Sequence, residues 1–406
     1  MQSIDHMDEP LKILCLSPRT PPAVRPQAIL LGKMIPEWLR QGLRPVILSY
    51  DNNGPWDVAA PLYTFPPFRA GRIVSHVPPL RDFFEYLWLR RTCRRILPLL
   101  EKHRIDVIFS FANPQISNVI GAMLKRRSGI PYVSNFSDPW LDNPLEKHNW
   151  FVKRRIARQE RYAVENSDRV VVCNHVLRDL IMKKYPAAWS AKTTIVPHCY
   201  DPSDYPAVTK PHDGDFIFRY IGAFYQKRNP DPLLRAIRTL KDKQAAGGRK
   251  FRLELVGADL GYTNYSSGSL QESLRRFGVE DVVKVLPSVS YIESLGLMKT
   301  ADCLIAIDAD MPGSPFLPCK PIDYAGSGMP IVAITPDHSP THWFLQNLGY
   351  RTFDYRHLDG LADHLADMMC GRVAVKPDYG FLKQFQVKET TAKLIAVFRQ
   401  ALKNRG

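Results

Sequence analysis

The chain has 406 residues, of which 45% are hydrophobic and 23% are charged, as in soluble globular proteins. This length exceeds one ordinary hydrophobic core and predicts two domains. No apolar run approaches the roughly 20 residues of a membrane-spanning helix, and the first ten residues are too polar for a signal peptide. Because the seven cysteines include no Cys-x-x-Cys pair, we expect reduced thiols and a cytoplasmic protein.

The net charge of +15 is concentrated in the first half of the chain. Residues 1–200 carry 29 Lys and Arg against 17 Asp and Glu, whereas residues 201–406 carry 26 against 23. The first half is therefore expected to meet an acidic partner, either nucleic acid or an anionic membrane. No recognised nucleic-acid-binding motif is present, so we favour the membrane and expect no nucleic-acid partner.

Strand-like runs alternate with helical segments, which predicts parallel α/β sheets. The first half contains five runs rich in Val, Ile, Leu and Phe: Lys12–Ser17, Pro45–Tyr50, Asp106–Phe111, Pro131–Asn135 and Arg169–Cys173. Several are nearly continuous, as expected for strands covered on both faces. A helical segment, Gln27–Gln41, lies between the first two runs, and Gly42 is expected to end it.

Residues 81–97 form a basic and aromatic helix candidate. One stripe is expected to face outward and consists of Phe84, Trp88, Arg91 and Arg95. The opposite stripe is expected to pack inward and consists of Tyr86, Leu89, Cys93, Ile96 and Leu100. An outer stripe of aromatic and arginine side chains suits an anionic membrane interface, although an ordinary solvated face is the alternative. We therefore expect peripheral association with the inner face of the cell membrane.

A short strand at Thr194–Val196 leads into the Pro-rich stretch Pro197–Pro206, which is expected to connect two domains. The second half then repeats the pattern with five further runs: Phe216–Ile221, Phe251–Val256, Val282–Leu286, Cys303–Asp308 and Pro330–Ile334. We predict domains at 1–200 and 201–388, with the C-terminal helix, 389–406, a candidate to pack back on the first. Two Rossmann-like, doubly wound sheets facing across a cleft would bind ligands at the carboxyl ends of their strands.

Two loops of the second half have the composition of a phosphate and sugar site. Gly222 ends a strand, and Lys227 and Arg228 then precede a helix, so these residues could bind a diphosphate. Lys320 and Asp323 lie on a short helix after another strand, where an anion and a hydroxyl could be held together. Solvated charges and a helix-surface carboxylate are the alternative interpretations. Phosphate beside hydroxyls is the chemical profile of a nucleotide sugar.

Asp138 follows the strand at 131–135 and could accept a proton from, or orient, an acceptor hydroxyl. Capping the next helix is its alternative role. Arg19 and Arg25 could meet an acceptor phosphate or be solvated. Asp308-Ala-Asp310 resembles a cation-binding pattern, but strand ends often carry Asp for turns, and the histidines form no zinc-binding pair. We therefore expect no metal.

Four stretches together resemble family 4 retaining glycosyltransferases. Gly222 with Arg228 resembles the Gly-Arg-Leu…Lys-Gly stretch of that family. Lys320-Pro-Ile-Asp-Tyr-Ala-Gly-Ser-Gly-Met-Pro resembles its Lys-x-x-Glu-Tyr-x-Ala-x-Gly-x-Pro variant, and Pro197-His-Cys-Tyr-Asp resembles its Pro-Asn-Gly-x-Asp turn. Asn135-Phe-Ser-Asp-Pro-Trp resembles the Arg-Asp-x-Trp loop of its bacterial surface-polysaccharide branch. The stretches fall in family order and span nearly the whole chain.

The resemblance implies the glycosyltransferase-B fold, with the donor bound mainly by the second domain and the acceptor by the first. The family's first acidic motif residue would fall at Pro315, and an Arg next to the first Gly is replaced by Ala223. The resemblance therefore implies that the backbone at Phe316 and Leu317 contacts the donor sugar, and that diphosphate binding rests on Arg228 with Lys227.

The resulting prediction is a retaining glycosyltransferase without a cofactor. It would move a sugar from a nucleoside-diphosphate donor to a glycan or lipid-linked acceptor hydroxyl in cell-surface polysaccharide synthesis, with Asp138 and Arg228 as catalytic residues. Two alternatives stay open. One is a catalytically degraded protein that binds sugar nucleotides, and the other is a nucleotide-sugar epimerase of the same fold.

Overall fold

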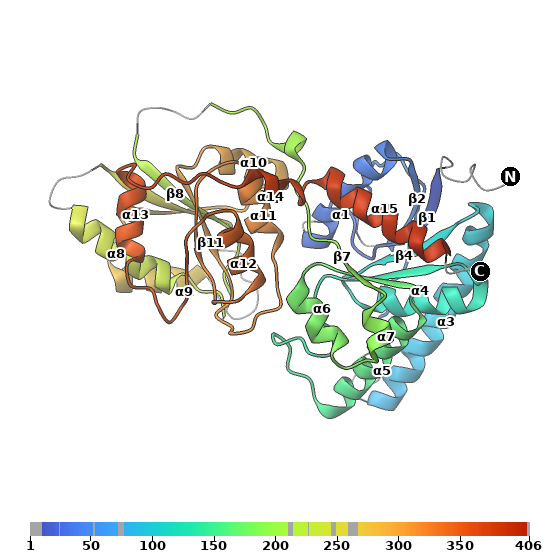
Figure 1. Cartoon of the computed structure of the whole chain (residues 1–406). Helices are drawn as coiled ribbons and strands as arrows, with labels where there is room; N and C mark the ends of the chain where they lie inside the picture. Colours follow the sequence, from blue (N-terminus) through green and yellow to red (C-terminus); the bar gives the residue numbers. More distant parts are fainter. Residues whose placement is uncertain are drawn as a thin grey trace. The chain divides into compact units, whose positions relative to one another are not determined.

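The computed structural model describes residues 10–403 except positions 24, 52, 72–76, 210–213, 226, 245–248 and 259–266. The chain divides into two compact units (Figure 1). Unit 1 is Met1–His198 together with Val387–Gly406, and unit 2 is Cys199–Gln386. The division after His198 lies inside the Pro197–Pro206 stretch. The assignment of the acceptor to one half and the donor to the other stays a prediction.

Unit 1 is built on a seven-stranded parallel sheet with the order β3-β2-β1-β4-β5-β6-β7. Its strands are β1 (Leu11–Leu16), β2 (Leu43–Tyr50), β3 (Leu62–Phe65), β4 (Val107–Phe111), β5 (Tyr132–Phe136), β6 (Arg169–Val172) and β7 (Thr193–Ile195). Its helices are α1 (Pro26–Arg40), α3 (Pro78–Lys102), α4 (Ile116–Ser128), α5 (Trp150–Asn166), α6 (His175–Met182), α7 (Ala187–Ser190) and α15 (Val387–Lys403). The sheet is apolar because helices cover both faces.

The last helix, α15, belongs to unit 1 although it follows the whole of unit 2 in the chain (Figure 1). Its Phe398 is fully buried, and the Phe398 ring lies 5.2 Å from the ring of Phe109 on β4. Trp38 of α1 packs against the same Phe109 ring at 6.0 Å. Helices α1 and α15 therefore close one face of the sheet, and Leu14 and Leu16 of β1 face the other side under α3 and α4.

Helix α3 corrects two of the orientations predicted from its sequence. Leu89, Cys93, Ile96 and Leu100 are buried as predicted. Trp88 is turned inward and its Nε1–H donates to the carbonyl oxygen of Pro66 at 3.1 Å, because the residues after β3 cover this side of the helix. Tyr86 is instead 50% exposed. A helical period assigns residues to a stripe, but it does not reveal how wide the covered face is.

Unit 2 is built on a six-stranded parallel sheet with the order β10-β9-β8-β11-β12-β13. Its strands are β8 (Phe216–Ile221), β9 (Phe251–Val256), β10 (Val283–Leu286), β11 (Cys303–Ile307), β12 (Ile331–Ile334) and β13 (Thr352–Phe353). Its helical segments are η1 (Pro202–Asp204), α8 (Asp231–Gln244), α9 (Ser267–Phe277), α10 (Tyr291–Lys299), α11 (Cys319–Gly326), α12 (Pro340–Asn347), α13 (Leu361–Met369) and α14 (Tyr379–Lys383). The prediction of two Rossmann-like parallel sheets is confirmed.

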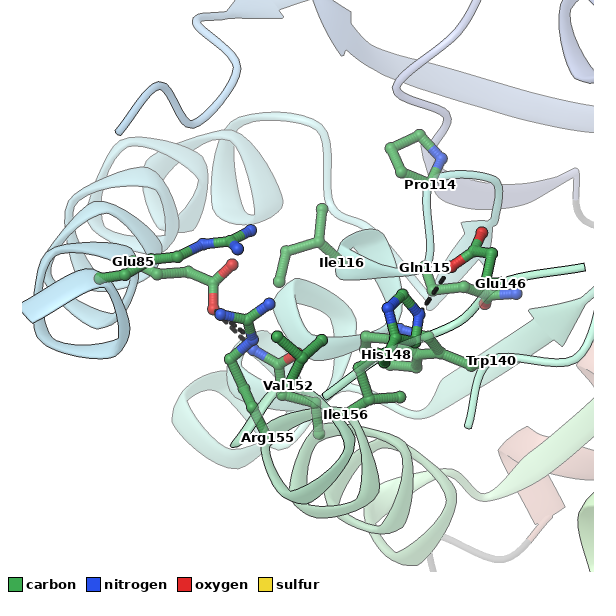
Figure 2. Close-up of a pocket in the computed structure, with 12 residues that line it drawn as sticks. Glu85, Pro114, Gln115, Ile116, Trp140, Glu146, His148, Val152, Arg155 and Ile156 are labelled. Atoms are coloured by element: carbon green, nitrogen blue, oxygen red, sulfur yellow. Dashed lines mark hydrogen bonds and ion pairs between the residues drawn. The ribbon is translucent and has the colours of Figure 1, made fainter. Parts of the chain in front are cut away.

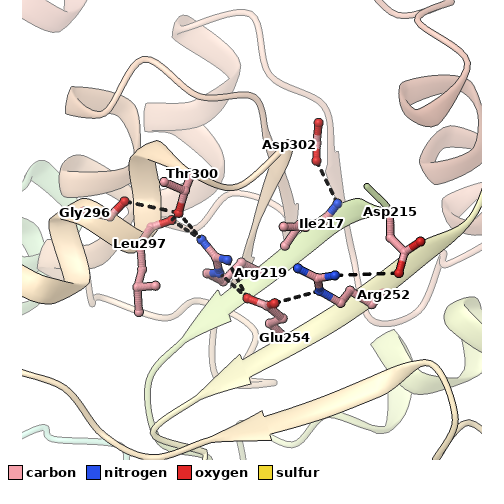
Figure 3. Close-up of polar contacts among 9 residues, drawn as sticks. All are labelled: Asp215, Ile217, Arg219, Arg252, Glu254, Gly296, Leu297, Thr300 and Asp302. Atoms are coloured by element: carbon pink, nitrogen blue, oxygen red, sulfur yellow. Dashed lines mark hydrogen bonds and ion pairs between the residues drawn. The ribbon is translucent and has the colours of Figure 1, made fainter. Parts of the chain in front are cut away.

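A buried ion pair fastens the first two strands of unit 2 (Figure 3). Arg219 of β8 and Glu254 of β9 occupy paired positions in the register, and the Arg219 Nε lies 2.7 Å from the Glu254 carboxylate. Arg219 also donates to the Leu297 carbonyl and the Thr300 hydroxyl at the end of α10. The guanidinium and the carboxylate, 4% and 5% exposed, thereby neutralise each other in the core.

Among the residues that the structure describes, no helix is long and apolar enough to cross a membrane.

Candidate functional site

The centre of the predicted donor site is the end of β8, where Gly222 follows the strand. Gly222 has a φ of 145°, a backbone conformation that side-chain-bearing residues rarely adopt. A Cβ at this position would overlap the ammonium of Lys320, which lies against the Gly222 backbone. Glycine is therefore required both for the turn and for the approach of Lys320 from a segment nearly one hundred residues later.

Arg228 is held near this point by backbone hydrogen bonds. It exchanges two with Tyr225, at 2.9 and 2.7 Å. The guanidinium lies 4.9 Å from the centre of the Tyr225 ring and 3.7 Å from Asp308 at the end of β11. The ends of β8 and β11 are adjacent in the sheet, so the topology brings Arg228 and Asp308 together.

The electrostatics of this cluster favour an added anion. Burial and the neighbouring Arg228 lower the pKa of Lys320 to about 7, since both oppose the charged ammonium. Within the described part of the chain, the buried Nε of Arg228 has no hydrogen-bond partner. Asp308 is the carboxylate nearest to Arg228, and burial raises its own pKa. The Asp323 carboxylate favours the charged form of Lys320 in the opposite direction. A diphosphate would add acceptors for both cations.

Asp323 lies one turn beyond Lys320 on α11 and is 4% exposed, so it is not a helix-surface carboxylate. The Tyr291 hydroxyl donates to its Oδ1 at 3.3 Å, and the carboxylate and burial together raise the pKa of Tyr291. Helix α11 is fixed to the end of β8 because the backbone N–H of Ile221 donates to the Tyr324 hydroxyl at 2.9 Å. Asp323, Lys320 and Gly222 consequently belong to one rigid assembly.

The loop before α11 leaves few free backbone N–H groups for the predicted contacts with a donor sugar. The backbone N–H of Phe316 donates to the Ser314 hydroxyl at 3.4 Å, and the side chain of Leu317 is 3% exposed in the core beside α11. Pro318 is the N-cap of α11 without a side-chain cap, and Pro321 removes one N–H from its first turn. The predicted backbone contacts of Phe316 and Leu317 with the donor stay predictions.

Lys227 differs from its neighbour Arg228. The Lys227 side chain is exposed, and its backbone carbonyl accepts a hydrogen bond from the N–H of Asp310 at 2.6 Å. This bond ties the Lys227 backbone to the segment after β11. An exposed ammonium must be ordered when it binds a ligand, which costs conformational entropy. Lys320 and Arg228 are already held in place and do not have this cost.

Two acidic sites of unit 2 have protein partners. Asp308 accepts a hydrogen bond from Thr335 at 2.8 Å in addition to its pairing with Arg228. A second group, Asp337, Asp354 and His357, has ligand atoms close enough for a cation. Arg356 binds the Asp354 carboxylate at 2.8 Å and holds the pKa of that group below its usual range, so a guanidinium already supplies the positive charge there.

Unit 1 contains the other predicted catalytic residue, Asp138, just beyond β5. Asn113 donates to its Oδ2 at 2.8 Å, and Gln115 donates to its backbone carbonyl at 2.9 Å. Burial raises the pKa of Asp138, and the nearby His198 opposes that rise. Conversely, the Cys173 and Asp138 side chains raise the pKa of His198 above its ordinary value, although burial alone would lower it. A carboxylate with a raised pKa is a stronger proton acceptor.

His198 was not singled out from the sequence, although its position in the Pro197-His-Cys-Tyr-Asp turn could have drawn attention to it. The Pro197-His dipeptide stands where the resembling family turn has Pro-Asn, which marked the position as a departure. Strand β7 carries His198 to the carboxyl end of the sheet, beside the end of β6, where Cys173 lies. Asp138, Cys173 and His198 thus come from three successive strands of unit 1.

Unit 1 contains an open pocket of about 350 Å³ (Figure 2). Gln115 and Trp140 line it. Gln115 is hydrogen-bonded to the backbone of Asp138, and Trp140 lies two residues after Asp138 in the sequence. One wall comes from the N-terminal parts of α3 and α5 and includes the pair formed by Arg155 and Glu85; residues before α4 and α5 complete the lining. Arg19 and Arg25, the other acceptor candidates, do not line this pocket; the Arg19 guanidinium lies 5.9 Å from the Tyr50 ring.

Comparison with known families finds a match over residues 30–204, with the model described as Glycosyltransferase Family 4. A D-inositol 3-phosphate glycosyltransferase of Kineococcus radiotolerans is 26% identical over 215 residues, which are 45% of this chain and 49% of the relative. The chain thus matches about half the length of that curated relative.

Solved structures with the same fold align with nearly the whole chain. Sucrose-phosphate synthase from Thermosynechococcus elongatus aligns with a TM-score of 0.72 and 14% identity, over 97% of this chain and 100% of its own. Anabaena Alr3699/HepE, solved in complex with UDP, aligns with a TM-score of 0.68 and 15% identity, over 96% of this chain and 100% of its own. At these identities the alignments establish the fold.

Proposed function

We propose that the chain, which matches the Glycosyltransferase Family 4 model over residues 30–204, transfers a sugar from a nucleoside diphosphate to an acceptor hydroxyl with retention of configuration. The observation that carries the proposal is the meeting of two largely buried cations, Lys320 and Arg228, beside the Gly222 backbone at the end of β8. Alr3699/HepE, which shares the fold, was solved with UDP, a ligand of the required class.

In this proposal the donor diphosphate lies between Lys320 and Arg228, over the Gly222 backbone. The two cations stabilise the charge that develops on the diphosphate as the bond to the sugar breaks. Asp323 accepts a hydrogen bond from a donor hydroxyl, with Tyr291 orienting its carboxylate. Because the protein itself supplies two positive charges, we propose that no metal or other cofactor is required.

We further propose that unit 1 binds the acceptor and that Asp138 orients or deprotonates the attacking hydroxyl. Its raised pKa suits this role, and the pocket lined by Gln115 and Trp140 offers space for a sugar. The acceptor is a glycan or a lipid-linked glycan of a cell-surface polysaccharide, met at the inner face of the membrane. The support is the positive charge of the first half of the chain and its likeness in the Asp138 loop to the surface-polysaccharide branch.

Calorimetry with UDP-glucose, UDP and uridine tests the diphosphate site in the Arg228→Ala variant. Removing one of two buried cations should weaken UDP-glucose and UDP by about 30-fold, or about 2 kcal/mol, and uridine by much less. The Lys383→Ala variant, which removes an exposed lysine of the same unit, should bind all three ligands normally. An equal loss for all three ligands would contradict the phosphate role of Arg228.

The two alternative functions give different products in the same experiment. Incubation of UDP-glucose with the protein, followed by NMR of the sugar, separates slow hydrolysis or transfer from epimerisation and from binding alone. Release of the sugar with its anomeric configuration retained supports the proposal. A 2-epimer supports the epimerase, and an unchanged sugar in the presence of tight binding supports the degraded binding protein.

A further inference from the structure

The N-terminal ends of α3 and α5 expose a concentration of large apolar side chains. We call this surface the aromatic rim, and it consists of Leu80, Phe83, Phe84 and Leu87 on α3 with Trp150 and Phe151 on α5. Each is between 42% and 61% exposed. The rim therefore gathers six of the large exposed hydrophobic residues of the described chain at two helix ends. Single exposed hydrophobic residues are common on protein surfaces, but such a cluster indicates a contact surface.

Polar contacts bring the two helix ends together. Asp82 lies between the rim residues of α3 and binds Arg155 at 3.3 Å and Arg158 at 3.1 Å, both from α5. Gln159 donates to Glu85 at 2.9 Å. The same parts of α3 and α5 form one wall of the unit 1 pocket (Figure 2). The rim is thus one surface at one side of unit 1.

The charges around the rim are predominantly positive. Helix α3 carries six basic and three acidic side chains, and α5 carries five basic and two acidic ones. Three of these acidic groups, Asp82, Glu85 and Glu160, have partners within unit 1. The outer stripe of α3 continues from Leu80, Phe84 and Leu87 directly to arginines, and the Arg154 guanidinium lies 5.2 Å from the Trp150 ring.

We propose that the aromatic rim is a membrane-docking surface whose occupant is an anionic lipid leaflet. Phe and Trp side chains partition into the interfacial layer of a bilayer, and adjacent arginines bind lipid phosphates. Along α3, the apolar side chains of the rim come first and the arginines follow, so the apolar end could enter the bilayer while the arginines stay at the level of the lipid phosphates. This surface differs from the stripe predicted from sequence, because Trp88 is turned inward and the start of α5 supplies Trp150 and Phe151 instead.

The docking also assigns a side of unit 1 to the acceptor. The pocket lined by Gln115 and Trp140 adjoins the rim, so the polar head of a lipid-anchored molecule would reach it without leaving the leaflet. This last step rests on the proposed function, whereas docking itself does not. Vesicle binding and sugar transfer are consequently measured separately.

Flotation of the full-length protein with vesicles tests the docking. Vesicles of phosphatidylcholine alone and with about a third phosphatidylglycerol are compared at low and high salt, where we expect strong binding to the anionic vesicles at low salt only. Trp150→Ala with Phe151→Ala should weaken binding about tenfold or more. Arg91→Ala with Arg95→Ala should weaken it about 25-fold, or about fivefold for each arginine.

The matched control is Tyr379→Ala, which removes an aromatic side chain of unit 2 that is 61% exposed, as Trp150 is. It should bind vesicles normally. Insertion is followed by quenching of tryptophan fluorescence with brominated lipids, and the quenched component should disappear in Trp150→Phe while vesicle binding persists. Thermal melting and UDP-glucose binding should be unchanged in every rim variant.

Three results would overturn the inference. One is binding that is independent of anionic lipid and of salt, and another is binding without quenching of Trp150. The third is a concentration-dependent dimer in sedimentation that Trp150→Ala with Phe151→Ala abolishes, because the rim would then be covered by a second copy of the chain. If UDP-glucose is bound and turned over while vesicle binding fails, the docking is refuted and the proposed function stands.

Discussion

The buried Lys320 gives the proposed donor site a specific dependence on pH. In the free protein the pKa of Lys320 is lowered to about 7, because burial and Arg228 both disfavour its charge. A diphosphate placed against this ammonium would restore its pKa toward the ordinary value of about 10.4. Binding above neutral pH must therefore be accompanied by uptake of one proton.

The size of the effect follows from the distance between the two pKa values. Below pH 7 the lysine is already charged, so the affinity for a nucleotide sugar should hardly change. Above pH 7 each pH unit costs about 1.4 kcal/mol of binding free energy, until the pKa of the complex is reached. Between pH 6 and pH 9 the affinity should therefore fall about 100-fold, or about 2.7 kcal/mol.

Calorimetry with UDP-glucose provides the measurement, because its diphosphate is a diester without a titration near neutral pH. Titrations at pH 8 in buffers of different ionisation enthalpy should give an uptake of about one proton per ligand bound. Lys320→Met should abolish both the proton uptake and the slope, and should weaken binding at pH 6. Lys284→Met, which removes an exposed lysine on the edge strand β10, should retain the behaviour of the native protein.

Two results would refute this reasoning. A constant affinity from pH 6 to pH 9 would show that the Lys320 ammonium is not next to the bound diphosphate. An undiminished slope in Lys320→Met would assign the proton to another group. Melting temperatures across the same pH range are needed to confirm that the protein stays folded.

Two further predictions concern the framework of unit 2. Gly222→Ala should lower the free energy of unfolding by about 1–3 kcal/mol and weaken UDP-glucose binding, because the Cβ is strained and displaces Lys320; Gly313→Ala, also at positive φ but in open space, should affect stability alone. Glu254→Ala should cost about 3–5 kcal/mol in urea unfolding because it leaves Arg219 buried without a counter-charge, and a loss under 1 kcal/mol would show that the pair is not structural.

The sequence alone determined the architecture of both units. All eleven strands predicted from apolar runs are present, with ends shifted by no more than two residues. These runs can be recognised because a parallel strand covered on both faces is nearly continuously apolar. The two strands that were not predicted, β3 and β13, lie at the edges of their sheets and have four and two residues, too few for a periodic pattern.

The sequence also indicated where ligands would be held in unit 2. Loops that follow parallel strands gather at one edge of the sheet, so Gly222, Arg228 and Lys320 were predicted to be near one another from their positions after β8 and β11. The tertiary structure decided how they meet. It placed Lys320 over Gly222, paired Arg228 with Asp308 and left Lys227 exposed, none of which follows from spacing along the chain.

Only the tertiary structure could decide which face of a helix is covered and what surrounds a buried charge. Trp88 and Tyr86 exchanged their predicted environments because residues after β3 lie on one side of α3. The surroundings of His198, with Cys173 and Asp138, arise only because three strands end side by side. Helical and strand periods are local properties of the chain, whereas burial and pKa depend on neighbours that are distant in sequence and are brought close by packing.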